Sequence, residues 1–258
     1  MVTTHPARTG ATSWTPAELG VLLQAVEPVP DPAPPAGSVT VHDRVVDVVP
    51  LAGAPDGTPG HADLVAVGRL VAGLEIAVRS LGWEPERDTA DDARADPLVR
   101  LTATRRRPAI PAALAMHRVD RRLREGRLVG TGSPDAAQVV DVARGGSTTR
   151  AWCVLANGPS QGGAPSWHSP GTPVPEAASI RLPWTRDPVL AVCTHDDEPA
   201  DHVAAGIAAH RAVVTAGLRG LLAAVHTAGV AEPADRVAWG HRVDPGHGRV
   251  QALVHLHT

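Results

Sequence analysis

The sequence predicts an α+β protein with an antiparallel or mixed sheet and long central helices, built as a single-chain pseudo-dimer of two related halves. One observation is an internal repeat: residues 63–82 and 201–220 both begin Asp-x-Val-Ala-x-Gly and both close on glycine, without a gap. Another is that a short β-branched run precedes each frame, at 45–49 and 189–193, and a further strand-like run follows each frame after a linker. A repeated strand-helix-strand unit indicates one body in which the two long helices pack together. The alternative is that two helices rich in Ala, Val and Gly align through biased composition alone.

The repeat predicts a single body over residues 1–258, long enough to bury a large core. The first half is expected over about 15–107 and the second over about 108–258. The stretch 157–184 is rich in Gly and Pro, and we expect a lid-like loop there or a disordered segment. A chain that contains both halves of a dimer is expected to be a monomer.

Local signals place the elements of the first half. Thr15, Pro16 and Glu18 supply an N-cap, a first-turn proline and a capping-box acid, which predict a helix to about Val26. A proline-rich segment follows, and then a hairpin is expected over 38–42 and 45–49. The remaining expectations are a long helix over about 61–81, an acidic linker over 84–96, a strand over 97–104 and a helix over 108–122.

In the second half, Ser133 is the expected N-cap of a helix that has Pro134 at its first position. The Gly-Thr-Gly ahead of it is therefore expected to be a turn and not a dinucleotide fingerprint. The other expected elements are strands over 148–156 and 189–193, a long helix over about 200–227, a short helix over 233–239 and a terminal strand over 250–257.

Composition restricts what the chain can bind. There is no Phe, Tyr or Lys, all 24 basic residues are Arg, and the six Trp are the only large anchors for a planar ligand. The net charge of -3 gives no reason to expect nucleic acid or an acidic membrane surface as a partner. No apolar run is long enough for a membrane span and the first residues lack a signal segment, so a cytoplasmic protein is expected. Cys153 and Cys193 lack ligand spacing and are expected to be buried, reduced and structural.

Three segments carry a family resemblance: Leu81 to Pro85 at the end of the first long helix, the block from His117 to Val129, and the region from Asp201 to Leu256. Together they cover about half of the chain. They resemble the nitroreductase superfamily, and within it the divergent actinobacterial Acg-like branch, whose single chains resemble a nitroreductase dimer fused end to end. The resemblance implies a nitroreductase-like fold with FMN between its halves, and hydride transfer from NAD(P)H through FMN to a nitroaromatic, quinone or similar small-molecule acceptor.

The middle block is similar to the family's Arg-x-Ser/Thr-x-Arg motif, in which alternate side chains point toward the flavin phosphate and ribityl chain. By position, His117 stands at the first Arg, Val119 at the hydroxyl residue and Arg121 at the second Arg. The resemblance therefore implies Arg121 as the phosphate ligand, with Arg118 and Arg122 as neighbours. The resemblance requires no catalytic acid, and none is assigned.

Two tryptophans in the Gly/Pro-rich stretch, Trp167 and Trp184, are the expected covers of a bound ligand, because the chain has no other large aromatic type. The family's amide-bearing loop corresponds to 27–35, which contains no Asn, Gln, Arg or Trp. This depletion leaves open a non-catalytic alternative, a flavin-sequestering or stress-associated binding protein on the same fold. It also leaves open that the arginines form a solvated, carboxylate-paired turn.

Other chemistry has little support in the sequence. There is no P-loop, HExxH, GxSxG or paired CxxC. His255 and His257 form an H-x-H pair on one face of the terminal strand, which would need a third ligand such as His241 or His247. No metal site is predicted.

Overall fold

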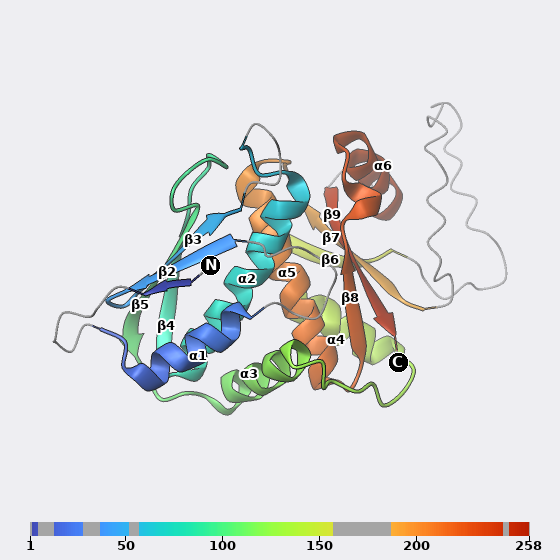
Figure 1. Cartoon of the computed structure of the whole chain (residues 1–258). Coiled ribbons are helices and arrows are strands. Elements are labelled where there is room, and N and C mark those ends of the chain that lie inside the picture. The colour runs from blue at the N-terminus through green and yellow to red at the C-terminus, as the bar shows by residue number, and fades with distance from the viewer. Residues whose placement is uncertain are drawn as a thin grey trace, which may run out of the picture.

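The computed structural model describes residues 2–4, 13–27, 37–51, 57–156, 187–244 and 248–257. Over these residues the protein is a mixed α+β structure, in which two sheets lie on either side of two long helices (Figure 1). The helices are α1 (Pro16–Val26), α2 (His61–Ser80), α3 (Pro111–Arg124), α4 (Ala136–Gly146), α5 (Pro199–Leu218) and α6 (Pro233–Val243), with a 3-10 turn η1 (Ala228–Val230). The strands are β1 (Val2–Thr4), β2 (Gly37–His42), β3 (Val45–Pro50), β4 (Trp83–Thr89), β5 (Val99–Arg106), β6 (Ala151–Leu155), β7 (Val189–Thr194), β8 (Leu222–His226) and β9 (Arg249–His257).

Each sheet contains an antiparallel four-stranded unit. The first runs β2-β3-β5-β4, and β1 adds a parallel strand at its edge; the second runs β6-β7-β9-β8. The order of elements along the chain is also the same in both units: a helix, two strands, a long helix and two more strands, with η1 and α6 inserted before β9. In both units the last strand lies inside the sheet, between its two neighbours.

The two long helices touch backbone to backbone where they cross. A Cβ added to Gly68 would lie 2.0 Å from the carbonyl oxygen of Val203 and 2.8 Å from the Cα of Gly206. The contact is reciprocal, because a Cβ added to Gly206 would lie 2.0 Å from the carbonyl oxygen of Val65. Glycine is therefore required at both positions, since any side chain would force α2 and α5 apart.

Two main cores lie between the long helices and the sheets. The first combines α1, α2 and the inner face of the first sheet, including Leu74 and Leu101. The second combines α4, α5 and the second sheet. Val203 of α5 packs in the first core and Val65 of α2 packs in the second, so each long helix contributes to both. Among the described helices, none is long and apolar enough to cross a membrane.

Several local predictions are confirmed. The Thr15 hydroxyl accepts the Glu18 backbone N–H and the Glu18 carboxylate accepts the Thr15 N–H, which is the expected capping box of α1. The hairpin of β2 and β3 has the expected register, with Asp43 at a positive φ of 46° in its turn.

Other boundaries were wrong. The predicted helix 200–227 ends at Leu218, because Gly220 adopts a positive φ of 73°, and the following residues pair with β9 as strand β8. The predicted linker 84–96 contains most of strand β4, which pairs with β5 along its length. The N-cap of α4 is Asp135 and not Ser133, because the Asp135 carboxylate accepts the Gln138 N–H. Strand β1 was not anticipated.

Candidate functional site

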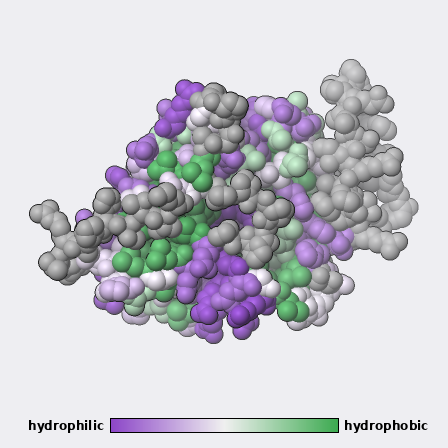
Figure 2. All heavy atoms as spheres, in the orientation of Figure 1, coloured by the Kyte–Doolittle hydropathy of each residue, from purple (hydrophilic) through white to green (hydrophobic). Residues whose placement is uncertain are grey.

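The three arginines named from the sequence lie together on α3. Arg118, Arg121 and Arg122 are all exposed and line one side of the helix. Figure 2 shows a hydrophilic surface over α3 at the lower edge of the molecule. The two expected aromatic covers, Trp167 and Trp184, and the lid-like stretch 157–184 that contains them, lie outside the described residues. The arginine cluster is therefore the part of the candidate site that can be built from contacts.

The end of α3 brings one more arginine to this cluster. The Gly126 N–H donates to the Leu123 carbonyl and the Arg127 N–H donates to the Arg122 carbonyl at 2.8 Å, the paired bonds of a Schellman motif. Gly126 has a φ of 63°, which a residue without a Cβ adopts at little cost. This turn folds the chain back and sets Arg127 beside the last turn of the helix.

Four arginines and one glutamate line a surface hollow of about 270 Å³. They are Arg118, Arg121, Arg122, Glu125 and Arg127. Because one carboxylate faces four guanidinium groups, the hollow has a net positive charge and is suited to an anion. Helix C-termini repel anions through their dipole, so the arginines must supply the attraction here.

Glu125 is the acceptor inside the hollow. Its Oε1 accepts the Nε–H of Arg121 at 2.7 Å, and its Oε2 accepts an Nη1–H of Arg127 at 3.3 Å. The hydrogen bond from Arg121 lowers the pKa of Glu125, and the same bond raises the pKa of Arg121. Arg118 donates to a carbonyl of its own helix, on Leu114, at 3.3 Å.

The opposite face of α3 holds the helix in place. Asp120 and Arg124 pair one turn apart at 3.1 Å, and the buried imidazole of His210 on α5 lies 2.7 Å from Asp120. Arg124 also donates to the carbonyl of Glu27 at 2.6 Å, and a Cβ on Gly73 would lie 2.1 Å from its Nη2. Burial alone would raise the pKa of Asp120, but His210 and Arg124 lower it. Burial lowers the pKa of His210, and the charge of Asp120 opposes that shift.

Apolar contacts on the same inner face join α3 to both long helices. Val119 packs against Ile76 of α2 and Val214 of α5. Since Val119 and Asp120 point inward, Arg118, Arg121 and Arg122 point away from the contact between α2 and α5. A cleft between the long helices lined by Arg121 is therefore absent from the described structure.

The arginine hollow suits one part of FMN. Four guanidinium groups match a phosphate, which prefers several charged donors. The isoalloxazine ring needs an aromatic or apolar surface, and none of the five lining residues supplies one. The described residues thus fit the phosphate and leave the ring without a surface.

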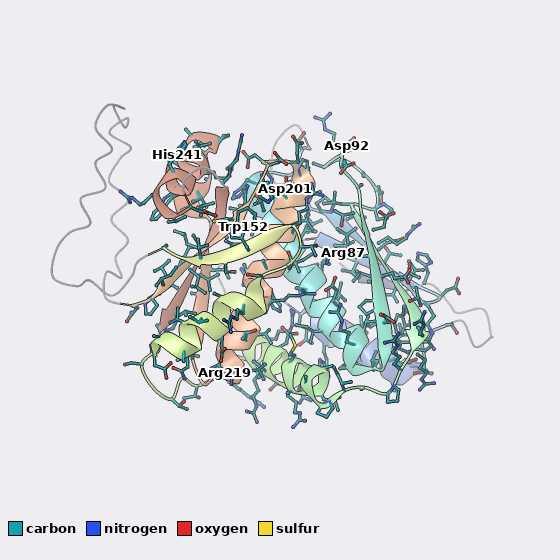
Figure 3. All side chains as sticks on the ribbon, turned by 180° about the vertical axis from the view of Figure 1, so that it is seen from behind. Arg87, Asp92, Trp152, Asp201, Arg219 and His241 are labelled. Atoms are coloured by element: carbon teal, nitrogen blue, oxygen red, sulfur yellow. The ribbon has the colours of Figure 1, made fainter. Side chains whose placement is uncertain are left out.

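A second polar cluster, which the sequence reasoning missed, lies where α5 begins. Asp197 receives two hydrogen bonds from Arg236 at 2.8 and 2.9 Å, and His202 and Gln251 lie 2.9 and 3.1 Å from it. Burial alone would raise the pKa of Asp197, but these three partners lower it. The nearby labels Asp201 and Trp152 mark this end of the second unit in Figure 3. Sequence patterns could not indicate this cluster, because Asp197 and Arg236 pair across 39 positions of the chain.

Buried atoms without partners lie beside this cluster. His61 meets His202 edge to face with ring centroids 4.8 Å apart. Neither ring nitrogen of His61 makes a well-formed hydrogen bond to a described residue, although the Gln251 side chain lies near enough to raise the pKa of His61. Nδ1 of His202 and Oε1 of Gln251 are likewise buried and lack a well-formed hydrogen bond to any residue that the structure describes. Burial lowers the pKa of His61 to about 4, with His202 and Arg236 adding to the effect.

The described residues supply neither a metal site nor a reactive thiol. They contain no group of three His, Cys, Asp or Glu side chains arranged to hold a metal ion. His255 and His257 stack at 5.2 Å, while His247 lies outside the described residues. Cys153 and Cys193 are free, and burial raises the pKa of both to about 12, so neither is a ready nucleophile.

The comparisons with known proteins leave the family open. No protein-family model matches the chain, and no curated protein matches it significantly.

Proposed function

We propose that the chain is a nitroreductase-like single-chain pseudo-dimer that binds FMN through its phosphate, as a flavin-sequestering protein and not as an oxidoreductase. The pseudo-dimer is supported by the repeated order of elements and by the reciprocal contact between Gly68 and Gly206. In such a chain the second half takes the place of a partner subunit, so the protein is expected to be a monomer.

The observation that carries the proposed binding is the convergence of four arginines on one hollow of α3. Phosphate monoesters carry two negative charges near neutral pH, and arginine binds them through paired N–H donors. Arg121 is the phosphate ligand by its position in the family motif, and Arg118, Arg122 and Arg127 supply further donors.

Binding is favoured over catalysis because of what surrounds the hollow. Hydride transfer requires the flavin ring to be held firmly against NAD(P)H and then against an acceptor. The hollow is open and its lining side chains are charged, so it holds the phosphate and leaves the ring without a fixed orientation.

An FMN-dependent NAD(P)H oxidoreductase is the second candidate. The recurrence of the helix-strand-strand unit around two long helices favours it, because that is the architecture implied by the resemblance. It predicts that the FMN-loaded protein oxidises NADH or NADPH when a nitroaromatic or quinone is added, and the sequestering function predicts no oxidation above that of free FMN.

The test is a titration of FMN with the purified protein, followed by flavin fluorescence. Saturable quenching is expected, and Arg121→Ala is expected to weaken FMN binding about fivefold, the effect of one exposed charge-assisted contact. Arg105→Ala is the control, because Arg105 is an exposed arginine of β5 outside the hollow. No quenching by the wild-type protein, or equal loss in both variants, would contradict the proposal.

A further inference from the structure

The carboxylate of Glu125 lies where an anion would bind. Its two oxygens accept hydrogen bonds from two different arginines, Arg121 at 2.7 Å and Arg127 at 3.3 Å. Two guanidinium groups that converge on adjacent oxygens of one anion form the arrangement by which arginines hold phosphate. Glu125 is thus bound in the hollow as a ligand would be.

The other two arginines of the hollow are not held by this carboxylate. Arg118 donates to the Leu114 carbonyl of its own helix, at 3.3 Å. The side chain of Arg122 makes no hydrogen bond or ion pair to any described residue, although its charge contributes to the lowered pKa of Glu125. An anion with more oxygens and more charge than a carboxylate could therefore engage donors that Glu125 leaves unused.

We propose that Glu125 is an internal competitor that occupies the anion position of the hollow, so that the site admits dianionic phosphate monoesters and rejects monoanions. This inference rests on the proposed function, because it concerns the same arginines. A free carboxylate would make the same contacts as the Glu125 carboxylate, which is already tethered in place, so the exchange yields no favourable binding free energy. A phosphate dianion binds more favourably than a carboxylate, because its second charge and third terminal oxygen can also engage Arg118 or Arg122.

The competitor is weak enough to be displaced. The side chain of Arg121 is 56% exposed and that of Arg127 is 75% exposed. Ion pairs between such exposed groups contribute little free energy. Glu125 can therefore give up its two hydrogen bonds when a ligand arrives, but it stays beside the hollow at the end of α3. Its charge still opposes the ligand at short range, so its removal is expected to tighten phosphate binding about tenfold at low ionic strength.

The experiment compares wild-type protein, Glu125→Gln and Asp92→Asn by calorimetric titration with FMN, inorganic phosphate and acetate in dilute buffer. Glu125→Gln keeps the size of the side chain and removes its charge. Asp92→Asn removes the same charge from an exposed residue at the end of the molecule far from α3 (Figure 3). The expected result is about tenfold tighter binding of FMN and phosphate by Glu125→Gln only, with acetate binding gained in that variant alone.

The outcomes separate the two claims. If wild type binds FMN and Glu125→Gln binds it no more tightly, the competitor role is refuted and the flavin-binding function stands. If wild type binds inorganic phosphate but not FMN, and Glu125→Gln binds phosphate about tenfold more tightly, the competitor role stands and flavin binding is refuted. If phosphate binds only to Glu125→Gln, the wild-type hollow does not admit dianions and the competitor role is refuted. If neither protein binds, both claims fail, and if Asp92→Asn tightens binding equally, the effect is one of net charge and the competitor role fails.

Discussion

Replacing Gly68 by alanine would place a methyl group at the closest contact between the two long helices. The new Cβ would lie 2.0 Å from the Val203 carbonyl oxygen, whereas ordinary contacts begin at 3.4 Å. The obstruction is backbone, so no side chain can rotate to make room. Helices α2 and α5 must therefore separate by more than 1 Å at the crossing, which loosens the packing of both main cores.

The cost follows from known core substitutions. Overpacking a close-packed core costs about 1–3 kcal/mol, and a backbone obstruction belongs at the upper end. Alanine is favoured over glycine in a helix by about 1 kcal/mol, which offsets part of that cost. We therefore expect Gly68→Ala to lower the free energy of unfolding by about 2 kcal/mol. Gly206→Ala should do the same, because its Cβ meets the Val65 carbonyl oxygen at the same 2.0 Å.

Urea unfolding followed by circular dichroism measures this difference. The control is Gly20→Ala in α1, where an added Cβ meets nothing within 4 Å. It should stabilise the protein by about 0.5–1 kcal/mol through helix propensity alone. The double variant at Gly68 and Gly206 should lose less than the sum of the two single losses, because one separation of the helices relieves both contacts. A Gly68→Ala protein as stable as wild type would refute this packing.

Three further predictions concern buried polar groups. Asp120→Leu leaves the guanidinium of Arg124 buried without its carboxylate, so we expect a loss of about 3–5 kcal/mol in urea unfolding, and an unchanged midpoint would contradict it. Burial alone would raise the pKa of Glu18, but hydrogen bonds from Thr15, Trp83 and Arg44 lower it to about 2. The ionised Glu18 therefore stabilises the folded protein above pH 4.5, and this stabilisation is lost as the pH falls toward 2. Glu18→Gln should accordingly cost about 1–2 kcal/mol at pH 7 and nothing near pH 2, measured by thermal unfolding across that range. The pKa of His61 is about 4 in the folded protein, so the unfolded chain binds more protons between pH 6.5 and 4 and stability falls as the pH drops. His61→Leu should reduce the loss of stability between pH 6.5 and 4 by about 1–2 kcal/mol. If wild type and variant lose the same stability over this range, the burial of neutral His61 is refuted.

Elements with strong local signals could be predicted from the sequence. The capping box of Thr15 and Glu18 fixes the start of α1, because both partners lie within one turn. The repeated frame predicts both long helices, and α2 and α5 are each 20 residues long, although the predicted end of α5 was wrong.

Elements that depend on distant partners could not be predicted. Strand β4 is mostly charged and is a strand because β5 pairs with it. The largely apolar residues 222–226 suit a helix as well as a strand, and their pairing with β9 decides between them. Gly220 was the available signal, because it closes the repeated frame and ends α5.

The candidate site divides in the same way. The exposed face of α3 could be predicted, because Arg118, Arg121 and Arg122 are close in sequence and helical spacing brings them together. The Schellman turn that adds Arg127 is a local feature that the pattern Glu-Gly-Arg could have indicated. The contact of Asp120 with His210 joins residues 90 positions apart, so only the fold reveals it.

Comparing FMN with riboflavin tests the central claim most directly, because the two ligands share the flavin ring and differ in the phosphate. Titration of each into the wild-type protein in dilute buffer, and again in 0.5 M salt (on the order of a 4 Å screening length), measures what the phosphate contributes. Binding through the arginines of α3 predicts that FMN binds in dilute buffer, that salt weakens it and that riboflavin does not bind. Equal affinity for FMN and riboflavin, or no binding of either, would contradict the account.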